Sequence, residues 1–88
     1  MIYPISAYID GPVKKGDRVV IIEDVVTTGQ TTIEAIQQAI KADMMVVKVL
    51  ALIDRQEGGR EAIENLGIPF EAIFTKDDLI KLSNDHRK

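Results

Sequence analysis

The stretch Arg-Val-Val-Ile-Ile-Glu-Asp-Val-Val-Thr-Thr-Gly-Gln-Thr-Thr, which covers Arg18–Thr32, decides the fold that this sequence predicts. Its apolar run, Val19–Ile22, is β-branched throughout and predicts a buried strand of a parallel sheet over Arg18–Glu23. A loop of small polar residues follows, and a helical pattern begins at Thr31. This order of strand, loop and helix directs backbone N–H groups and the positive end of a helix at an anion, usually a phosphate.

Two acidic residues, Glu23 and Asp24, follow the apolar run. We expect them where the strand ends, at the edge of the sheet at which open α/β folds bind ligands. Ionised carboxylates only accept hydrogen bonds, so they suit sugar hydroxyls, whereas backbone N–H donors suit a phosphate. Acids beside phosphate donors therefore predict a site for a ribose phosphate.

The length and composition indicate one small globular domain. The chain has 88 residues, of which 45% are hydrophobic and 28% are charged. A domain of this size buries only about 60% of its unfolded surface, so we expect a thin core and a partner subunit, namely a homodimer. The chain has no cysteine, which excludes disulfides and thiolate zinc sites.

The charge and hydropathy of the chain restrict its partners. The net charge of −3 argues against a nucleic-acid or anionic-membrane surface. No apolar stretch approaches the ~20 residues that span a bilayer, and the N-terminus lacks the apolar segment of a signal peptide. We therefore expect a cytoplasmic protein that binds small molecules.

The rest of the chain alternates between strand and helix patterns, which predicts an α/β fold with a mostly parallel sheet and flanking helices. Residues 1–17 are expected to form an edge strand and a connection, because Pro4 is confined to a sheet edge or a strand start. Residues 18–82 form the βαβαβα core, and 83–88 a tail. The expected core elements after the first strand are a helix over Thr31–Ala42, a strand over Met44–Ile53, a helix over Arg60–Leu66, a strand over Ile68–Phe74 and a helix from Thr75 to about Ser83.

Three positions predict how helices begin and end. Thr31 or Thr32 is a candidate cap of the first helix, with Glu34 completing a capping box. Thr75 is the expected N-cap of the last helix, followed by the acids of its first turn. Gly67 is expected to close the second helix, and Gly58–Gly59 to form a flexible loop before it.

The run Val-Ile-Ile-Glu-Asp-Val-Val-Thr-Thr-Gly-Gln-Thr resembles the phosphoribosyl-pyrophosphate loop of type I phosphoribosyltransferases. Downstream, Leu-Ile-Asp-Arg-Gln-Glu-Gly-Gly-Arg-Glu, Leu-Gly-Ile-Pro and Ile-Phe-Thr-Lys-Asp-Asp-Leu are similar to the C-terminal half of the orotate branch of that family. The resemblance covers most of the chain, from Asp10 to Leu82. It implies a Rossmann-like core and transfer of phosphoribose from phosphoribosyl pyrophosphate to orotate, with release of pyrophosphate.

The resemblance also implies a role for individual residues. Glu23 and Asp24 would hold the ribose hydroxyls, and Asp24 would stabilise positive charge at the anomeric carbon. Arg55 would bind the orotate carboxylate, for which a planar guanidinium is well suited, and Thr27 would contact the base as well. Mg²⁺ would be carried by substrate oxygens and water, with no direct protein ligand. The residues implied to bind phosphoribosyl pyrophosphate are Glu23, Asp24, Thr27, Thr28, Gly29, Gln30 and Thr31.

The sequence departs from this family in two respects. The orotate enzymes carry a further N-terminal half with a mobile catalytic loop, so we expect a truncated half-domain, for which turnover is an open question. Position 30 is Gln where the family commonly has Gly or another small residue, which would crowd the phosphate loop.

Other interpretations of the same residues stay open. The acids could simply end a strand, the threonines could cap a helix, and Arg55 could be a solvated surface residue. A non-catalytic ribose-phosphate-binding module would use the same loop without chemistry. A receiver-like phosphoacceptor domain would use Asp54, with Thr75 and Lys76 after the next strand. A purely structural fragment that pairs through an open sheet edge is the remaining alternative.

Overall fold

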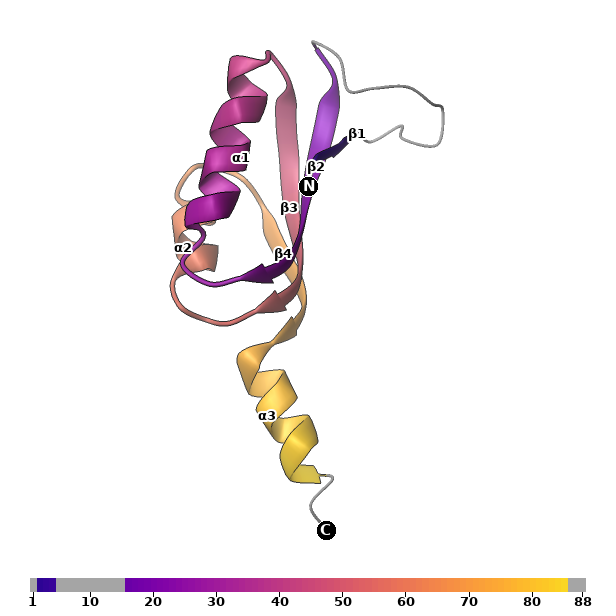
Figure 1. Cartoon of the computed structure of the whole chain (residues 1–88), viewed down its shortest axis with the longest axis vertical. Helices are drawn as coiled ribbons and strands as arrows, with labels where there is room; N and C mark the ends of the chain where they lie inside the picture. The colour runs from indigo at the N-terminus through magenta and orange to yellow at the C-terminus, as the bar shows by residue number, and fades with distance from the viewer. Residues whose placement is uncertain (1, 5–15, 86–88) are drawn as a thin grey trace.

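The computed structural model describes residues 2–4 and 16–85, which form a four-stranded sheet in the order β1-β2-β3-β4 (Figure 1). β2, β3 and β4 are parallel to one another, and β1 pairs with β2 in the antiparallel direction. This arrangement confirms the predicted α/β fold with a mostly parallel sheet. The strands are β1 Ile2–Pro4, β2 Arg18–Val26, β3 Met45–Asp54 and β4 Phe70–Thr75, and the helices are α1 Gln30–Lys41, α2 Gly59–Glu64 and α3 Lys76–Asp85.

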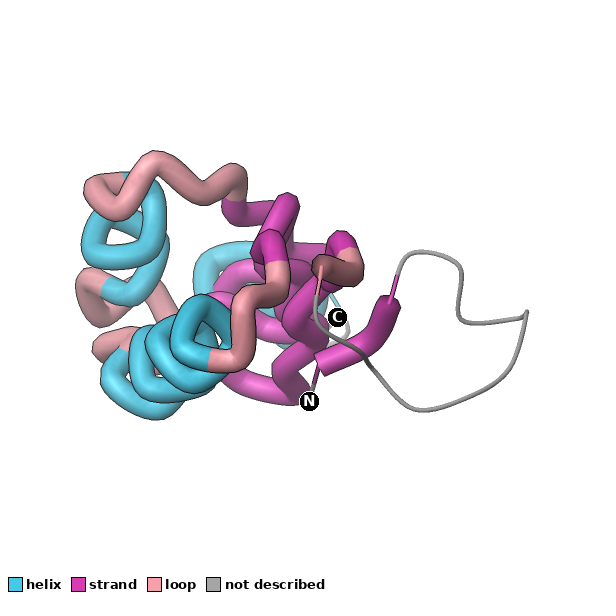
Figure 2. The backbone as a smooth tube through the Cα atoms, turned by 90° about the horizontal axis from the view of Figure 1, so that it is seen from above, coloured by secondary structure: helices cyan, strands magenta, loops and turns pink. Residues whose placement is uncertain are grey.

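The core lies between one face of the sheet and two helices. Figure 2 shows α1 and α2 on the same side of the strands. Ile21, Val49 and Phe70 are in register across β2, β3 and β4, and all three are buried. They pack with Ile36 of α1 and Ile63 of α2 in one hydrophobic cluster. Because side chains alternate along a strand, this register gives the sheet one apolar face that the helices cover.

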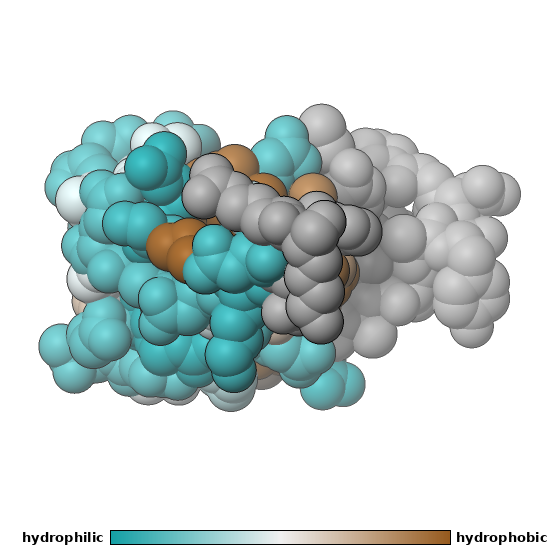
Figure 3. Space-filling view, turned by 90° about the horizontal axis from the view of Figure 1, so that it is seen from below, coloured by the Kyte–Doolittle hydropathy of each residue, from teal (hydrophilic) through white to brown (hydrophobic). Residues whose placement is uncertain are grey.

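The opposite face of the sheet is more exposed. Ile22 of β2, Leu52 of β3 and Ile73 of β4 are 38%, 45% and 56% exposed. The α3 helix extends away from the end of β4 (Figure 1), and its Leu79 and Leu82 are also exposed. Seen from below, the end of the molecule that carries α3 is mainly hydrophilic, with small hydrophobic areas (Figure 3).

Two details at the start of α1 differ from the sequence prediction. The strand β2 does not end at Glu23 but continues to Val26, so the two acids lie within the strand. The helix begins at Gln30, and its N-cap is Gly29 in the left-handed conformation, with φ 86° and no side-chain hydrogen bond. The predicted threonine cap and its capping box with Glu34 are therefore wrong. A backbone position with positive φ favours glycine, which explains why the N-cap is Gly29 and not a threonine.

At the other helix ends, the predictions for Thr75 and Gly67 are confirmed, whereas the predicted start of α2 is wrong. A capping box is present at α3: the Asp78 N–H donates to Thr75 Oγ1 at 3.1 Å, and the Thr75 N–H donates to Asp78 Oδ2 at 2.9 Å. α2 begins one residue early, at Gly59, and ends at Glu64, while Gly67 has the expected left-handed conformation with φ 82°. The flexible loop predicted at Gly58–Gly59 is wrong, because Gly59 is buried and starts α2.

Some predictions fall outside the described residues. Pro4 lies in the edge strand β1, as expected, but the predicted extension of this segment over 5–9 and the connection before Gly16 lie outside. The predicted tail is partly helical, since α3 continues to Asp85, and residues 86–88 lie outside the described range. Within the described ranges, no helix is long and apolar enough to cross a membrane.

Candidate functional site: a pocket at the start of α1

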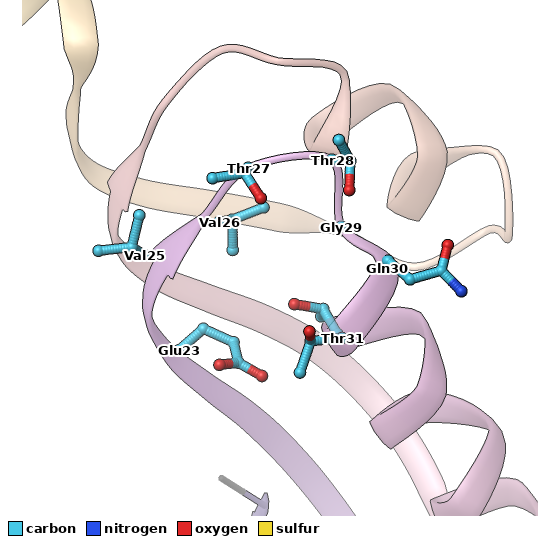
Figure 4. A pocket seen from close by; sticks show the side chains of 9 residues that line it. Glu23, Val25, Val26, Thr27, Thr28, Gly29, Gln30 and Thr31 are labelled. Atoms are coloured by element: carbon cyan, nitrogen blue, oxygen red, sulfur yellow. The ribbon is translucent and has the colours of Figure 1, made fainter.

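A pocket of about 160 Å³ lies where β2 passes into α1. It is smaller than the ~300–1,000 Å³ of a typical small-molecule site, so it fits one group of a ligand, such as a phosphate. Figure 4 shows the Glu23 side chain on the β2 side of this space and Thr31 on the α1 side. The residues that line the pocket are Glu23, Val25, Val26, Thr27, Thr28, Gly29, Gln30, Thr31 and Thr32.

The polar lining of the pocket comes from the loop and from the first turn of α1. Thr27 and Thr28 are exposed, so their hydroxyls are accessible to a ligand. The first N–H groups of any helix lack partners within the helix, and Gly29 supplies no side-chain cap to replace them. N–H donors, hydroxyls and the positive end of a 12-residue helix therefore meet at one point. This arrangement favours an anion.

The pocket includes six of the seven residues that the sequence assigned to phosphoribosyl pyrophosphate: Glu23, Thr27, Thr28, Gly29, Gln30 and Thr31. Asp24 follows Glu23 on β2; it is exposed and does not line the pocket. The Gln30 side chain extends away from the Glu23 carboxylate in Figure 4. Gln30 itself lines the pocket, and the crowding of the phosphate loop that the sequence predicts stays a prediction.

Arg55 lies in the neighbouring loop, which leaves β3 at the same edge of the sheet. Its backbone N–H donates to the Val26 carbonyl at 2.9 Å, so the two loops are in direct contact. Its guanidinium is exposed and pairs with Glu57, with Nε 3.3 Å from Oε2. A surface ion pair of this kind contributes little to stability, so Arg55 is available to a ligand that carries a carboxylate.

Asp54, the last residue of β3, is buried, with 3% of its surface exposed. Its Oδ1 accepts the Gln56 N–H at 2.8 Å, and its Oδ2 lies 3.8 Å from Arg60 Nε. The Arg60 guanidinium in turn lies over the Phe70 ring, 4.9 Å from its centroid. A carboxylate that is buried and bonded in this way supports the loop, so the structure does not favour Asp54 as the phosphoacceptor of a receiver-like domain.

Gly59 also belongs to this region, although the sequence predicts a flexible loop at Gly58–Gly59. The Gly59 N–H donates to the Thr27 carbonyl at 3.0 Å, and its backbone packs against Gly29. Two adjacent glycines carry no signal that distinguishes a loose loop from a close backbone contact. The contact is between residues 30 positions apart, which only tertiary structure brings together.

A second, shallower hollow of about 540 Å³ lies at the opposite edge, where β3 begins. Its lining is mainly apolar and includes Ile40, Met45 and Leu66. It lies at the amino ends of the parallel strands, whereas open α/β sheets bind ligands at the carboxyl ends. We therefore assign the functional site to the pocket beside α1.

Comparisons with known proteins agree with the geometry. A family model described as "Phosphoribosyl transferase domain" matches residues 2–70. The orotate phosphoribosyltransferase of Nostoc sp. is 47% identical over 75 residues, which are 84% of this chain and 36% of that protein. The UMP synthase of Leishmania donovani has a TM-score of 0.80 and 41% identity, over 97% of this chain and 20% of that one.

A further solved structure is that of Mycobacterium tuberculosis H37Rv orotate phosphoribosyltransferase in complex with 5-phospho-α-D-ribosyl 1-diphosphate. It has a TM-score of 0.74 and 33% identity, over 80% of this chain and 43% of that one. The chain thus spans little more than a third of the length of the Nostoc relative, 36%, and matches the C-terminal part of the curated relatives. The resemblance to the orotate branch is confirmed.

Proposed function

This chain belongs to the phosphoribosyl transferase domain family, and on that premise we propose that the pocket beside α1 binds the 5′-phosphate of phosphoribosyl pyrophosphate. The observation that carries the proposal is the start of α1: an N-cap glycine in the left-handed conformation without a side-chain hydrogen bond, flanked by exposed threonines. Such a helix start offers N–H donors and a positive dipole to a phosphate.

The two acids and the arginine hold the rest of the ligand in this proposal. Glu23, which lines the pocket, and Asp24, which follows it on β2, accept hydrogen bonds from the ribose hydroxyls. Arg55 binds the carboxylate of orotate from the neighbouring loop, and Thr27 contacts the base. The phosphate, ribose and base thus extend from the pocket along the carboxyl edge of the sheet.

The proposed reaction is that of an orotate phosphoribosyltransferase. A ring nitrogen of orotate gives up its proton to water and forms a bond to the anomeric carbon of the ribose, while the bond from that carbon to pyrophosphate breaks and its electron pair leaves with the pyrophosphate. Asp24 stabilises the positive charge that develops at the anomeric carbon. The product is orotidine 5′-monophosphate, a pyrimidine nucleotide.

Mg²⁺ belongs to the proposal as an ion that arrives with the substrate. Within the part of the chain that the structure describes, no three His, Cys, Asp or Glu side chains are grouped to hold a metal ion. Carboxylate and phosphate oxygens are the ligands that Mg²⁺ prefers, and it usually keeps several waters. The diphosphate of the substrate would therefore hold most of its coordination sphere, and the ion would neutralise charge on the leaving pyrophosphate.

A second candidate function follows from the length of the chain. The matched region is 36% of the Nostoc relative, so most of that enzyme lies outside the match. A ribose-phosphate-binding module without turnover would use the same pocket. A cytoplasmic homodimer is the assembly that we propose for either function.

Calorimetry with phosphoribosyl pyrophosphate and Mg²⁺ tests the proposal. We expect the unaltered chain to bind, and the double variant Asp24→Asn with Thr28→Val to lose at least about tenfold in affinity, equivalent to about 1.4 kcal/mol, because it removes a ribose acceptor and a phosphate donor. Glu34→Gln is the matched control, because it removes one charge from an exposed position of α1 outside the pocket.

An assay of orotidine 5′-monophosphate formation on the same samples separates the two candidates. Turnover that the double variant abolishes supports the transferase. Binding without turnover supports the non-catalytic module. Equal affinity in the unaltered chain and the double variant contradicts the assignment of the site.

A further inference from the structure

Gly59 joins the two loops at the carboxyl edge of the sheet. It is the first residue of α2 and is buried. Its N–H donates to the Thr27 carbonyl at 3.0 Å, and four residues earlier the Arg55 N–H donates to the Val26 carbonyl at 2.9 Å. The segment Arg55–Gly59 is therefore hydrogen-bonded at both ends to the two residues that lead into the proposed phosphate loop.

The contact at Gly59 leaves no room for a side chain. A Cβ atom there would lie 2.7 Å from the Thr27 carbonyl oxygen and 3.2 Å from the Gly29 nitrogen, and closer still to Val26 Cγ1. In the other direction, a Cβ atom on Gly29 would lie 3.1 Å from Gly59 Cα. Two of these neighbours are backbone atoms of the loop, which can give way only if the loop itself moves.

The conformation of Gly59 does not by itself require glycine. In the described part of the chain the glycines with positive φ are Gly16, Gly29, Gly58 and Gly67, and Gly59 is not among them. An alanine would be a good residue in the first turn of a helix. The close approach of the Thr27–Gly29 backbone is therefore the physical reason for a glycine at this position.

We propose that Gly59 is a positioning residue that sets the orientation of the N–H groups of Gly29, Gln30 and Thr31 toward the phosphate, a role that rests on the function proposed for the pocket. The residue acts through the backbone of the loop and does not touch the ligand. Asp54 supports Gly59 through residues on both sides of it in sequence, because the Asp54 carboxylate accepts the Gln56 N–H and pairs with Arg60. The same segment carries Arg55, so two backbone hydrogen bonds join the proposed phosphate loop to the segment that makes the proposed orotate contact.

Gly59→Ala tests the proposal, with ribose 5-phosphate as the calorimetric probe. The added methyl group pushes the loop away, so we expect at least a tenfold loss of affinity. Gly67→Ala is the matched control, because it places an alanine at φ 82° near the other end of α2, with no atom within 4 Å of the new Cβ. It strains the backbone without contacting the loop, so we expect its affinity to stay within about threefold of the unaltered chain.

A second readout does not need a ligand. Amide resonances of Gly29 and Gln30 in the unliganded protein should shift in Gly59→Ala and stay in place in Gly67→Ala. An affinity of Gly59→Ala within threefold of the unaltered chain overturns the proposal. Absence of ribose 5-phosphate binding in the unaltered chain overturns the proposed function instead, and the amide resonances then decide whether Gly59 positions the loop.

A third comparison covers the case in which Gly59→Ala does not fold. Val26→Ala removes the Cγ1 atom nearest the added methyl group, so Gly59→Ala in that background keeps only the contact with the loop backbone. We expect the double variant to bind ribose 5-phosphate at least tenfold more weakly than Val26→Ala alone. Equal affinity of these two proteins counts against the proposal.

Discussion

The loops that leave β2 and β3 start at the same edge of the sheet but are held in different ways. Among the described residues, the hydrogen bonds of the Thr27–Gly29 loop are between backbone groups, and both of its threonines are exposed. The loop after β3 is held by side chains: Asp54 accepts the Gln56 N–H, and Gln56 Oε1 accepts the Asp77 N–H at 3.0 Å. Gln56 has φ 59°, an uncommon conformation for a residue other than glycine.

This difference indicates that the loop after β2 contacts a ligand and that the loop after β3 supports it. Hydroxyls and N–H groups that make no bonds to protein side chains are available to a ligand, as the loop after β2 requires. A buried carboxylate and an ion pair fix the loop after β3, which then supports its neighbour through Arg55 and Gly59. The three predictions that follow test this difference, beginning with the largest expected effect.

Asp54→Ala should cause the largest change, a loss of about 2–3 kcal/mol in the free energy of unfolding. The substitution removes the acceptor of the Gln56 N–H and one of the two carboxylates that pair with the half-buried Arg60, the other being Glu64. Urea denaturation measures the effect. Glu57→Ala is the control, because this exposed acid pairs with Arg55 at the surface and should cost less than about 1 kcal/mol. Equal losses in the two variants would show that the loop after β3 is not held by Asp54.

Arg55→Ala should have a smaller effect, on one ligand only. If the two loops bind different parts of the substrate, loss of the guanidinium weakens orotate binding about tenfold, or about 1.4 kcal/mol, and leaves the affinity for ribose 5-phosphate unchanged. Titration of the two ligands separately measures this. A parallel loss for both ligands would mean that the loops act as one site.

The smallest expected effect is the pH dependence at the start of α3, to which Gln56 connects the loop. The Thr75 N–H and then the Thr75 hydroxyl hold the pKa of Asp78 below its ordinary value of 3.8. A lowered pKa stabilises the folded chain above the unfolded-state value, and this contribution disappears as the pH falls through the folded-state value. The melting temperature of the unaltered chain should therefore decline below about pH 4 more steeply than that of Asp78→Asn. If the melting temperature falls equally steeply with pH in both proteins, Asp78 does not contribute to the loss of stability in acid.

Much of the fold could be predicted because its signals are local. The apolar runs of β2 and β3 and the apolar face of α1 gave the right order of strands and helices, and Thr75 with Asp78 gave the right cap. The end of β2 could not be predicted in this way, since Glu23 and Asp24 are polar residues that a strand tolerates when it pairs with a buried neighbour. Glu23 pairs with Ala51 in β3, and this pairing extends the strand.

In the candidate site too, the features with a local sequence signal could be predicted, and those that depend on tertiary packing could not. The motif Glu-Asp-Val-Val-Thr-Thr-Gly predicted most of the residues that line the pocket, because the loop between β2 and α1 is contiguous in sequence. That motif did not show that Asp24 lies outside the pocket lining while Glu23 lies within it, because the residues that border a pocket depend on how the strand packs against its neighbours.

The amino-acid sequence by itself determined the alternation of elements, the family and the contiguous loop that lines the pocket, since periodicity and short motifs act over a few residues. Only the tertiary structure decided the contact of Gly59 with that loop and the burial of Asp54. Both depend on contacts between segments far apart in the chain, and the close packing of two backbones leaves no pattern in either segment alone.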